Sequence, residues 1–280
     1  MDNFLKRSFT AVFIVLFILG GFWLHPLTFV ITGLVLAAGT QYEYYQLVKV
    51  SGVKPQFVAG LAAAVIIYCL SVLVAAGFIA SEMLLLVIPV LGLLMIFELY
   101  RHQEKPFDSL AHTFFPLVYT TLPFSLFSFS AFGHDGLSSL LGNSGMVFSP
   151  GIVIGFLLLL WANDTGAYIV GVTIGRHRLM ERISPKKSWE GFFGGMIISA
   201  AVAWLLSGFL GVVSTSGWII ISLIVSVTGT FGDLVESMFK RSLGVKDSGT
   251  IMPGHGGFLD RFDSAIMSFP AVYLYLTLFG

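Results

Sequence analysis

Apolar runs of about 18 or more residues recur along the whole chain, and no other feature constrains the fold as strongly. Hydrophobic residues make up 56% of the 280 positions, and charged residues make up only 11%. Such segments are typical of transmembrane helices, because about 20 apolar residues in a helix cross the hydrocarbon core of a bilayer. The alternation over about ten residues that marks transmembrane β-strands is missing from the sequence. The sequence therefore predicts an all-α polytopic membrane protein.

The hydropathy pattern predicts about nine transmembrane helices. They are expected at 8–24, 27–48, 57–78, 83–100, 110–132, 151–174, 189–210, 217–232 and 263–280. No clear small-x-small cleavage site follows the first of them, so we expect that helix to be retained and not removed as a signal peptide.

The distribution of Lys and Arg predicts the orientation in the membrane. With nine spans, the N-terminal tail and the segments near 49–56, 101–109, 175–188 and 233–262 lie on one side, and they contain all 15 Lys and Arg residues. The positive-inside rule makes this side the cytoplasm, with the N-terminus cytoplasmic and the C-terminus outside. We expect a multi-pass protein of the cell membrane, the inner membrane of a bacterium. The net charge of zero gives no reason to expect a nucleic-acid partner.

Polarity differs between the two halves of the chain. Residues 1–150 carry charges almost only at helix ends, so we predict a transmembrane scaffold of about five helices that faces lipid or an oligomer partner, which leaves a homodimer open. Residues 151–280 hold the polar residues within helices and both large charged segments, so we predict the catalytic region there. Cys69 is the single cysteine, which excludes an intrachain disulfide, and we expect it to serve packing.

The first polar motif is W-A-N-D-T-G-A-Y, from Trp161 to Tyr168. A carboxylate at the centre of a membrane helix costs about 2.5–3.5 kcal/mol on insertion scales, so Asp164 is expected to face a polar cavity, a cation or a substrate. The alternative is that Asn163, Asp164 and Thr165 only form hydrogen bonds between helices.

The second motif is I-S-P-K-K-S-W-E-G, from Ile183 to Gly191. Lys186 and Lys187 come just before a predicted helix, and Ser-Pro ahead of them indicates a shaped loop. The pair suits phosphate binding, but the positive-inside rule alone also predicts lysines here.

The third motif is G-D-L-V-E-S-M-F-K-R, from Gly232 to Arg241. In a helix, Asp233, Ser237 and Lys240 share one face. Glu236 and Lys240 also form a favourable i,i+4 pair, which is typical of an ordinary solvated helix. Asp233 is harder to explain in that way, because it closes a hydrophobic span.

The fourth motif is K-D, a short spacer and P-G-H-G-G-F-L-D-R-F-D, ending at Asp263. Its glycines let the backbone approach a ligand closely and expose N–H groups to an anion. Asp260 and Asp263 are spaced i, i+3 where the last helix is expected to begin. Together with Asp233 they offer three carboxylates, a set of hard oxygen ligands that suits Mg²⁺.

At these residues the sequence resembles the phosphatidate cytidylyltransferase (CDP-diacylglycerol synthase) family. The signature of that family runs S-x-x-K-R-x4-K-D, a spacer, then P-G-H-G-G-x-x-D-R-x-D. Every fixed position is filled here, by Ser237, Lys240, Arg241, Lys246, Asp247, Pro253, Gly254, His255, Gly256, Gly257, Asp260, Arg261 and Asp263. The two upstream motifs also resemble the family, with Ser188 where Thr is commoner; the hydroxyl is retained.

The resemblance implies transfer of CMP from CTP to phosphatidic acid, which gives CDP-diacylglycerol and pyrophosphate for phospholipid biosynthesis. The phosphate of the lipid is a nucleophile that is already ionised at neutral pH, so the task is to position two anions and neutralise their charge. We expect Mg²⁺ as cofactor, with a second cation left open.

Roles for the site residues follow as hypotheses. The expected metal ligands are Asp233, Asp260 and Asp263. The expected catalytic residues are Asp233, Asp260, Lys240, Arg241 and His255. The expected substrate-binding residues are Asn163, Asp164, Lys186, Lys187, Ser237, Lys246, Asp247, Gly256, Gly257 and Arg261. Of these, Arg261 is also a candidate to pair with Asp260 or Asp233.

Two other classes of protein remain as alternatives. One is another nucleotide-using lipid enzyme, such as a lipid kinase or a cytidylyltransferase for a different lipid, since the site chemistry would be nearly the same. The other is a cation-coupled transporter, in which Asp164 and Asp233 would bind the coupling ion. The lack of an internal repeat and the gathering of charge on one face disfavour the transporter.

Overall fold

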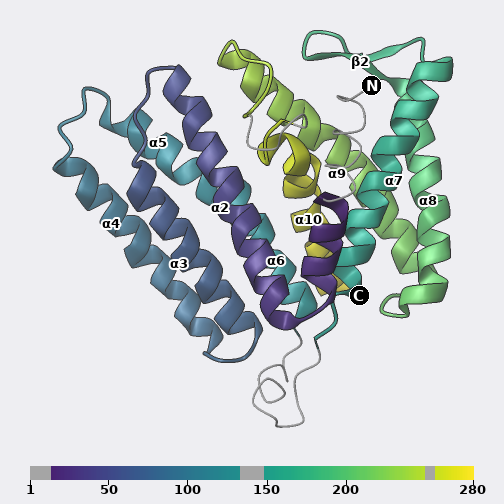
Figure 1. Cartoon of the computed structure of the whole chain (residues 1–280), viewed down its shortest axis with the longest axis horizontal. Coiled ribbons are helices and arrows are strands. Elements are labelled where there is room, and N and C mark those ends of the chain that lie inside the picture. The colour runs from purple at the N-terminus through teal and green to yellow at the C-terminus, as the bar shows by residue number, and fades with distance from the viewer. Residues whose placement is uncertain (1–13, 133–147, 250–255) are drawn as a thin grey trace. The chain divides into compact units, whose positions relative to one another are not determined.

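The computed structural model describes residues 14–132, 148–249 and 256–280. The chain forms two compact units (Figure 1). The first consists of Met1–Pro150 and Asp247–Arg261, and the second consists of Gly151–Lys246 and Phe262–Gly280. The segment that carries part of the fourth motif therefore belongs to the same unit as the N-terminal helices.

The first unit is a helical bundle. Its elements are α2 (Pro26–Val50), α3 (Phe57–Ala75), the 3-10 helix η1 (Ser81–Leu86), α4 (Val87–Leu99), α5 (Pro106–Pro116), the π-helix η2 (Leu117–Thr121) and α6 (Leu122–Ala131). Pro26 and Pro106 stand at helix starts, where the missing N–H has no partner to lose. Pro116 ends α5, and the backbone continues through the wider π-turn η2 into α6. The three elements together make one apolar rod, Pro106–Ala131.

A buried polar network joins the loops at one end of this bundle. Glu98 on α4 accepts hydrogen bonds from the Gln56 amide at 2.7 Å and from the Arg101 guanidinium at 2.8 Å. Arg101 also donates to the Ser109 hydroxyl at 2.9 Å and to the carbonyl oxygen of Lys54 at 2.9 Å. Because Glu98 is only 4% exposed, these donors compensate for the loss of water around its carboxylate.

The second unit contains α7 (Gly151–Ile174), a hairpin of β1 (Arg178–Met180) and β2 (Ser184–Ser188), α8 (Trp189–Leu210), α9 (Thr215–Ser242) and most of α10 (Leu259–Phe279). Glycines bring α7 and α8 together: a Cβ on Gly194 would lie 2.5 Å from Val170, and one on Gly195 would lie 2.6 Å from the carbonyl oxygen of Asn163. Small residues of this kind allow helices to pack closely in a membrane.

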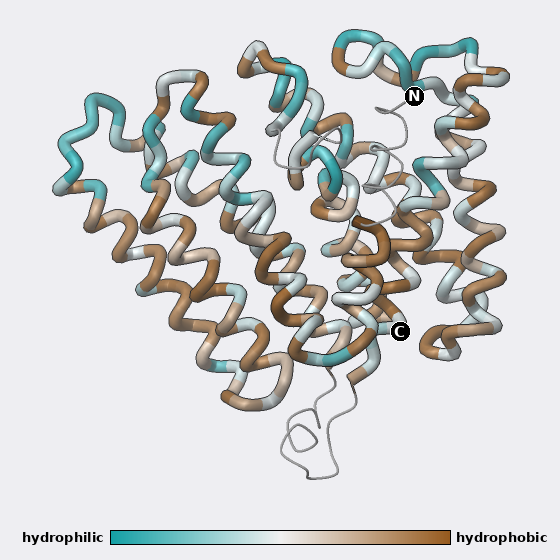
Figure 2. The backbone as a smooth tube through the Cα atoms, viewed as in Figure 1, coloured by the Kyte–Doolittle hydropathy of each residue, from teal (hydrophilic) through white to brown (hydrophobic). Residues whose placement is uncertain are grey.

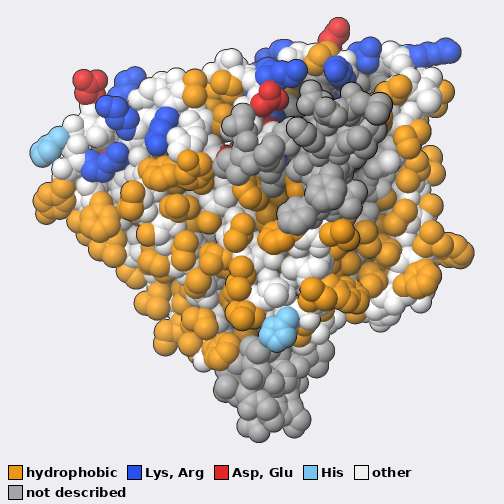
Figure 3. All heavy atoms as spheres, viewed as in Figure 1, with side chains coloured by type: hydrophobic (Ala, Val, Ile, Leu, Met, Phe, Trp, Pro, Cys, Tyr) orange, Lys and Arg blue, Asp and Glu red, His pale blue; other side chains and the backbone are white. Residues whose placement is uncertain are grey.

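Seven helices of the described residues are long and apolar enough to cross a membrane: Phe57–Ala75, Ser81–Leu99, Pro106–Ala131, Gly151–Ile174, Trp189–Leu210, Thr215–Ser242 and Leu259–Phe279. In both units, hydrophobic residues colour the helices and hydrophilic residues gather near helix ends (Figure 2). Apolar side chains cover the visible flank of α3 and α4, while Lys and Arg side chains lie at one end of these helices (Figure 3). Apart from the short hairpin, the predicted class of all-α polytopic membrane protein is confirmed.

The other two predicted spans differ from these seven. The first overlaps the shorter apolar helix Ile14–Trp23, and its predicted start lies outside the described residues. The second corresponds to α2, whose later half is made polar by Gln41, Glu43 and Lys49. The count of nine spans and the sides of the termini stay predictions.

Three predicted helix boundaries differ from the structure by four residues or more, and one of them is the start of α5, at Pro106 and not at residue 110. Helix α9 continues past the predicted end at residue 232 to Ser242, and it ends just before Gly244, whose φ is 71°. Bonds between side chains four residues apart, such as Glu236 with Lys240, favour this extension. Helix α10 begins at Leu259 and not at residue 263. The Leu259 N–H has no partner within the helix, and the Glu43 carboxylate accepts it.

Candidate active site

The close approach of α9 and α10 in the second unit brings two predicted metal ligands together. A Cβ on Gly232 would lie 2.8 Å from the carbonyl oxygen of Asp263 and 2.9 Å from the Cβ of Met267. Only a glycine leaves room for this contact. Asp233 follows directly, and its carboxylate is within electrostatic range of Asp263. Asp263 is 9% exposed, and its Oδ1 accepts the N–H of Ser264 at 2.6 Å.

Lys187 is the cation that faces these carboxylates. Its Nζ lies 2.6 Å from Oδ2 of Asp233 and 3.4 Å from the carbonyl oxygen of Thr230. The side chains of Lys187 and Asp233 are 27% and 36% exposed, so solvent still reaches the pair. Lys186, its neighbour on β2, is exposed, since successive side chains on a strand point to opposite faces.

The residues after Lys187 hold the hairpin in place. Ser188 caps α8 by accepting the N–H of Gly191 at 3.1 Å. Glu190 accepts the backbone N–H groups of Arg176 at 3.1 Å and of His177 at 3.2 Å, and it contacts the His177 ring at 2.6 Å. The second motif is therefore a shaped structure, as the Ser-Pro lead-in predicted, although the strands themselves were not predicted.

Helix α7 adds Asn163 and Asp164 to the same region of the second unit. Asp164 is within electrostatic range of Lys187, Asp233 and Asp263. Asn163 is buried, and its side chain forms a hydrogen bond with Asp164, whose own side chain is exposed. We call Asp164, Lys187, Asp233 and Asp263 the Asp–Lys cluster. Three carboxylates from three helices thus lie near a single lysine.

The later turns of α9 carry the other residues of the third motif. The Ser237 hydroxyl donates to Oδ1 of Asp233 at 3.1 Å, so the two oxygens of that carboxylate have different partners. Lys240 lies 2.5 Å from Glu236, which confirms the predicted i,i+4 pair. Both side chains are buried, so the pair does not lie on the solvated helix face that the sequence suggested. Arg241 is exposed and donates to the carbonyl oxygen of Val245 at 3.2 Å.

The first unit holds the described part of the glycine-rich segment, which comprises residues 247–249 and 256–261. Gly256 has φ +83°, a conformation that favours glycine, and a Cβ there would also lie 2.7 Å from the Asp260 carboxylate. Oδ2 of Asp260 accepts the N–H groups of Ser248 at 3.0 Å and Gly257 at 3.1 Å. Asp260 therefore organises the turn that precedes α10.

The remaining predicted residues are placed as follows. Lys246, Asp247 and Arg261 are exposed, and His255 lies outside the described residues. The roles assigned to all the predicted site residues stay predictions.

Sequence reasoning missed Glu43 and Ser248, which contact this glycine-rich segment. Glu43 lies on α2 and is 1% exposed; its Oε2 accepts the N–H of Leu259 at 2.8 Å and lies 3.3 Å from the Ser248 hydroxyl. The signal was available: Glu43 is a carboxylate in a long apolar segment, the same anomaly that drew attention to Asp164.

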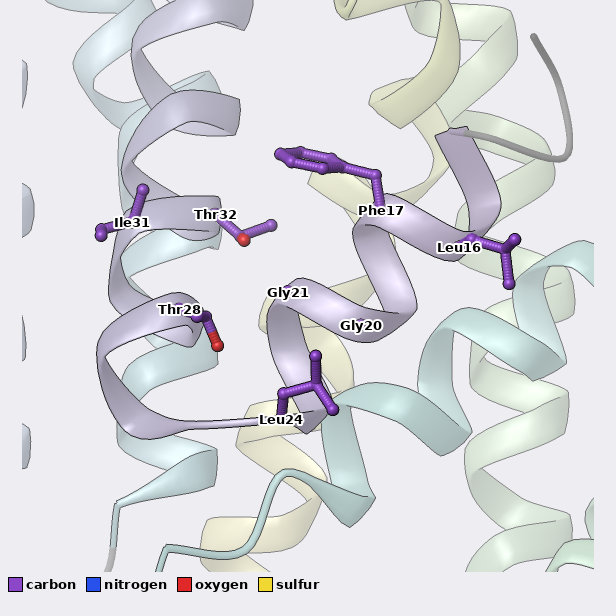
Figure 4. Close-up of a pocket in the computed structure, with 8 residues that line it drawn as sticks. All are labelled: Leu16, Phe17, Gly20, Gly21, Leu24, Thr28, Ile31 and Thr32. Atoms are coloured by element: carbon purple, nitrogen blue, oxygen red, sulfur yellow. The ribbon is translucent and has the colours of Figure 1, made fainter.

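One pocket of the first unit is unrelated to this chemistry. It has a volume of about 310 Å³ and lies between the helix Ile14–Trp23 and α2 (Figure 4). It is lined by Leu16, Phe17, Gly20, Gly21, Leu24, Thr28, Ile31 and Thr32. None of these residues carries a charge, so the pocket offers nothing that would neutralise a phosphate.

The fold and the Asp–Lys cluster define a polytopic membrane protein in which three carboxylates carried by helices lie near a lysine of the hairpin. The model of the cytidylyltransferase family matches residues 5–279. A phosphatidate cytidylyltransferase of Staphylococcus epidermidis is 40% identical over 176 residues, which cover 60% of this chain and 67% of the relative. Enzymes of the same name from Staphylococcus aureus and Staphylococcus saprophyticus are 41% and 42% identical over the same length.

The chain belongs to the cytidylyltransferase family, and it is therefore a nucleotidyltransferase. The match covers nearly the whole chain, so it includes both units and every motif that carried the resemblance. The family resemblance read from the sequence is confirmed.

Proposed function

We propose that this enzyme transfers CMP from CTP to phosphatidic acid. A phosphate oxygen of the lipid attacks the α-phosphorus of CTP, a new P–O bond forms, and the bond to the β-phosphate breaks. The products are CDP-diacylglycerol and pyrophosphate. The names of the relatives support this choice of substrates.

The observation that carries the proposal is the Asp–Lys cluster. Lys187 offers a cation to a phosphate oxygen, and it stands on a hairpin that Glu190 and Ser188 hold in place. Such prearranged charge is what transfer between two anions requires, since little covalent help is needed. Lys240, Arg241 and Lys246 are further cations for the triphosphate and the lipid headgroup.

The donor set fits Mg²⁺ bound jointly by protein and nucleotide. Asp233 and Asp263 supply hard carboxylate oxygens, with Asp164 close to both. Among the described residues, no group of three or more His, Cys, Asp or Glu side chains could hold a metal ion alone. Mg²⁺ commonly uses one or two carboxylates together with substrate phosphates, so the chain does not need a complete cage. When bound, Mg²⁺ would neutralise charge on the phosphates and on the leaving pyrophosphate. Asp260 is the third proposed ligand.

The reaction is proposed to occur on the cytoplasmic face of the cell membrane. All Lys and Arg residues fall in segments that the nine-span topology assigns to that side, where CTP is available. The acyl chains of phosphatidic acid would remain in the bilayer while the headgroup meets the charged residues.

The test is turnover by the purified protein in mixed micelles that contain phosphatidic acid, CTP and Mg²⁺, with CDP-diacylglycerol as the measured product. We expect Asp233→Asn to lower the rate by at least ~100-fold, because the carboxylate acts where charge develops. Asp108→Asn, which changes an exposed acid of α5, is the matched control and should leave the rate unchanged.

Two further arms separate the alternatives. Chelation of divalent cations should stop product formation, and ATP in place of CTP should give none. Phosphorylated lipid and ADP in the ATP arm, or no product from CTP, would refute the cytidylyl assignment and favour the kinase or the transporter.

A further inference from the structure

Glu43 joins helix α2 to the glycine-rich segment near the end of the chain. Its carboxylate is buried on α2, and its hydrogen-bond partners Ser248 and Leu259 are 205 and 216 residues away along the chain. The backbone of Phe258 also forms a hydrogen bond with it. A buried carboxylate costs free energy unless it is hydrogen-bonded, so these donors define one position for the segment.

The segment is shaped to accept this carboxylate. A Cβ on Gly257 would lie 2.2 Å from Oε2 of Glu43 and 2.4 Å from the Ser248 hydroxyl. A Cβ on Gly249 would lie 3.0 Å from Oε1 of Glu43. A side chain at Gly257 would therefore displace Glu43. At this position glycine leaves room for the Glu43 carboxylate of α2.

The same face of α2 makes a second contact with the segment. Gly39 is one turn before Glu43, and a Cβ there would lie 3.0 Å from the ring of Phe258. The ring and the carboxylate together fasten the segment at two successive turns of the helix.

Ser248 connects Glu43 to Asp260. Its hydroxyl contacts the Glu43 carboxylate at 3.3 Å and accepts the N–H of Asp260 at 3.3 Å, while its own N–H donates to Oδ2 of Asp260 at 3.0 Å. A change at Glu43 would thus reach Asp260 through one intervening residue.

We propose that Glu43 is a positioning residue for the reaction: it holds residues 248–249 and 256–260 in the conformation in which Asp260 and the backbone N–H groups of the segment meet the nucleotide phosphates and their metal. This inference rests on the proposed function. It assigns to the N-terminal part of the chain a direct part in shaping the glycine-rich segment of the first unit, in addition to scaffold.

The first test compares Glu43→Ala, Glu43→Gln and the control Glu104→Ala, which removes an exposed acid, in the micelle assay. Misplacement of binding groups by about 1 Å can cost ~100-fold, so we expect Glu43→Ala to raise the KM for CTP and the Mg²⁺ concentration for half-maximal rate by at least ~10-fold. Glu43→Gln keeps an acceptor oxygen and should recover to within ~5-fold of the unchanged protein. Glu104→Ala should alter neither constant.

The second test does not depend on activity. Hydrogen exchange should be at least ~5-fold faster in Glu43→Ala at the amides of Ser248 and Leu259. The Leu259 N–H loses its acceptor, and the Ser248 hydroxyl loses its contact with the carboxylate. Peptides from α7 should exchange as before. If the unchanged protein makes no CDP-diacylglycerol, the proposed function fails, and this exchange experiment still decides whether Glu43 fixes the segment.

A third variant covers the case in which Glu43→Ala does not fold. Ser248→Ala removes only the hydroxyl between Glu43 and Asp260, and it should raise the KM for CTP by ~3-fold while Tm stays close to that of the unchanged protein. Unchanged KM and unchanged exchange in the folded variants would overturn the proposal. So would an equal fall in kcat for Glu43→Ala and Glu43→Gln with no change in KM.

Discussion

Replacement of Gly232 by alanine tests whether the contact between α9 and α10 sets the position of Asp233. The added Cβ would lie 2.8 Å from the carbonyl oxygen of Asp263, whereas ordinary contact begins near 3.4 Å, so the two helices must move apart by up to 0.6 Å. The nearest atom is a backbone oxygen, so a side-chain rotation cannot relieve the clash. The helices would therefore shift at the positions of Asp233 and Asp263.

The free energies can be estimated from two opposing effects. Alanine in place of glycine within a helix stabilises by roughly 0.5–1 kcal/mol. Overpacking of a close contact destabilises by about 1–3 kcal/mol. Gly232→Ala should therefore be destabilised by up to about 2.5 kcal/mol, and its rate of CDP-diacylglycerol formation should fall by ~10–100-fold, since small displacements of catalytic groups are costly.

The matched control is Gly208→Ala on α8. Nothing lies within 4 Å of a Cβ at Gly208, so this variant carries the helix-propensity gain without the clash. Its Tm should equal or exceed that of the unchanged protein, and its rate should be the same. A normal rate and a raised Tm for Gly232→Ala as well would refute the claim that this contact positions Asp233.

Two other outcomes are expected. Lys187→Ala should lower kcat/KM by ~100-fold because it removes the cation beside Asp233, whereas Lys186→Ala, on the opposite face of β2, should lower it by less than ~10-fold; equal effects in the micelle assay would contradict the assignment. Glu98→Ala should lower the free energy of unfolding by about 1–3 kcal/mol, since the buried Gln56 amide keeps the carbonyl oxygen of Leu94 as acceptor but loses the Glu98 carboxylate, while the rate at low temperature stays normal; an unchanged Tm would count against this network.

The class of fold could be predicted from the sequence because hydropathy acts locally. The apolar composition of a run such as 57–78 or 189–210 is enough to predict a membrane span. The structure has helices at Phe57–Ala75 and Trp189–Leu210. The end of α9 could not be found in this way. Past Gly232 the helix is amphipathic and charged, so hydropathy stops indicating a span while Glu236 and Lys240 still stabilise the helix.

The candidate site could be predicted only in part. Motif spacing identified Asp164, Lys187, Asp233 and Asp263, which the structure brings together in one unit. It did not identify Glu43, although a carboxylate in a predicted span was an available signal; the partners of that residue could not be predicted, because they lie over 200 positions away along the chain. The hairpin was not predicted for a related reason, since the backbone N–H groups of Arg176 and His177 that bind Glu190 lie outside every motif singled out in the sequence.

The pairing of Lys187 with Asp233 has a consequence for substrate binding. The two side chains are 2.6 Å apart, so a phosphate that approaches Lys187 must compete with the carboxylate. A cation bound at Asp233 would remove this competition, and CTP and Mg²⁺ should therefore each strengthen the binding of the other by the same factor.

In Asp233→Asn the competition is gone: CTP should bind more tightly than to the unchanged protein when no metal is present, and added Mg²⁺ should strengthen binding by a smaller factor. Isothermal titration in micelles, with and without Mg²⁺, measures both quantities. Equal coupling in the two proteins would mean that Asp233 does not link the metal to the nucleotide.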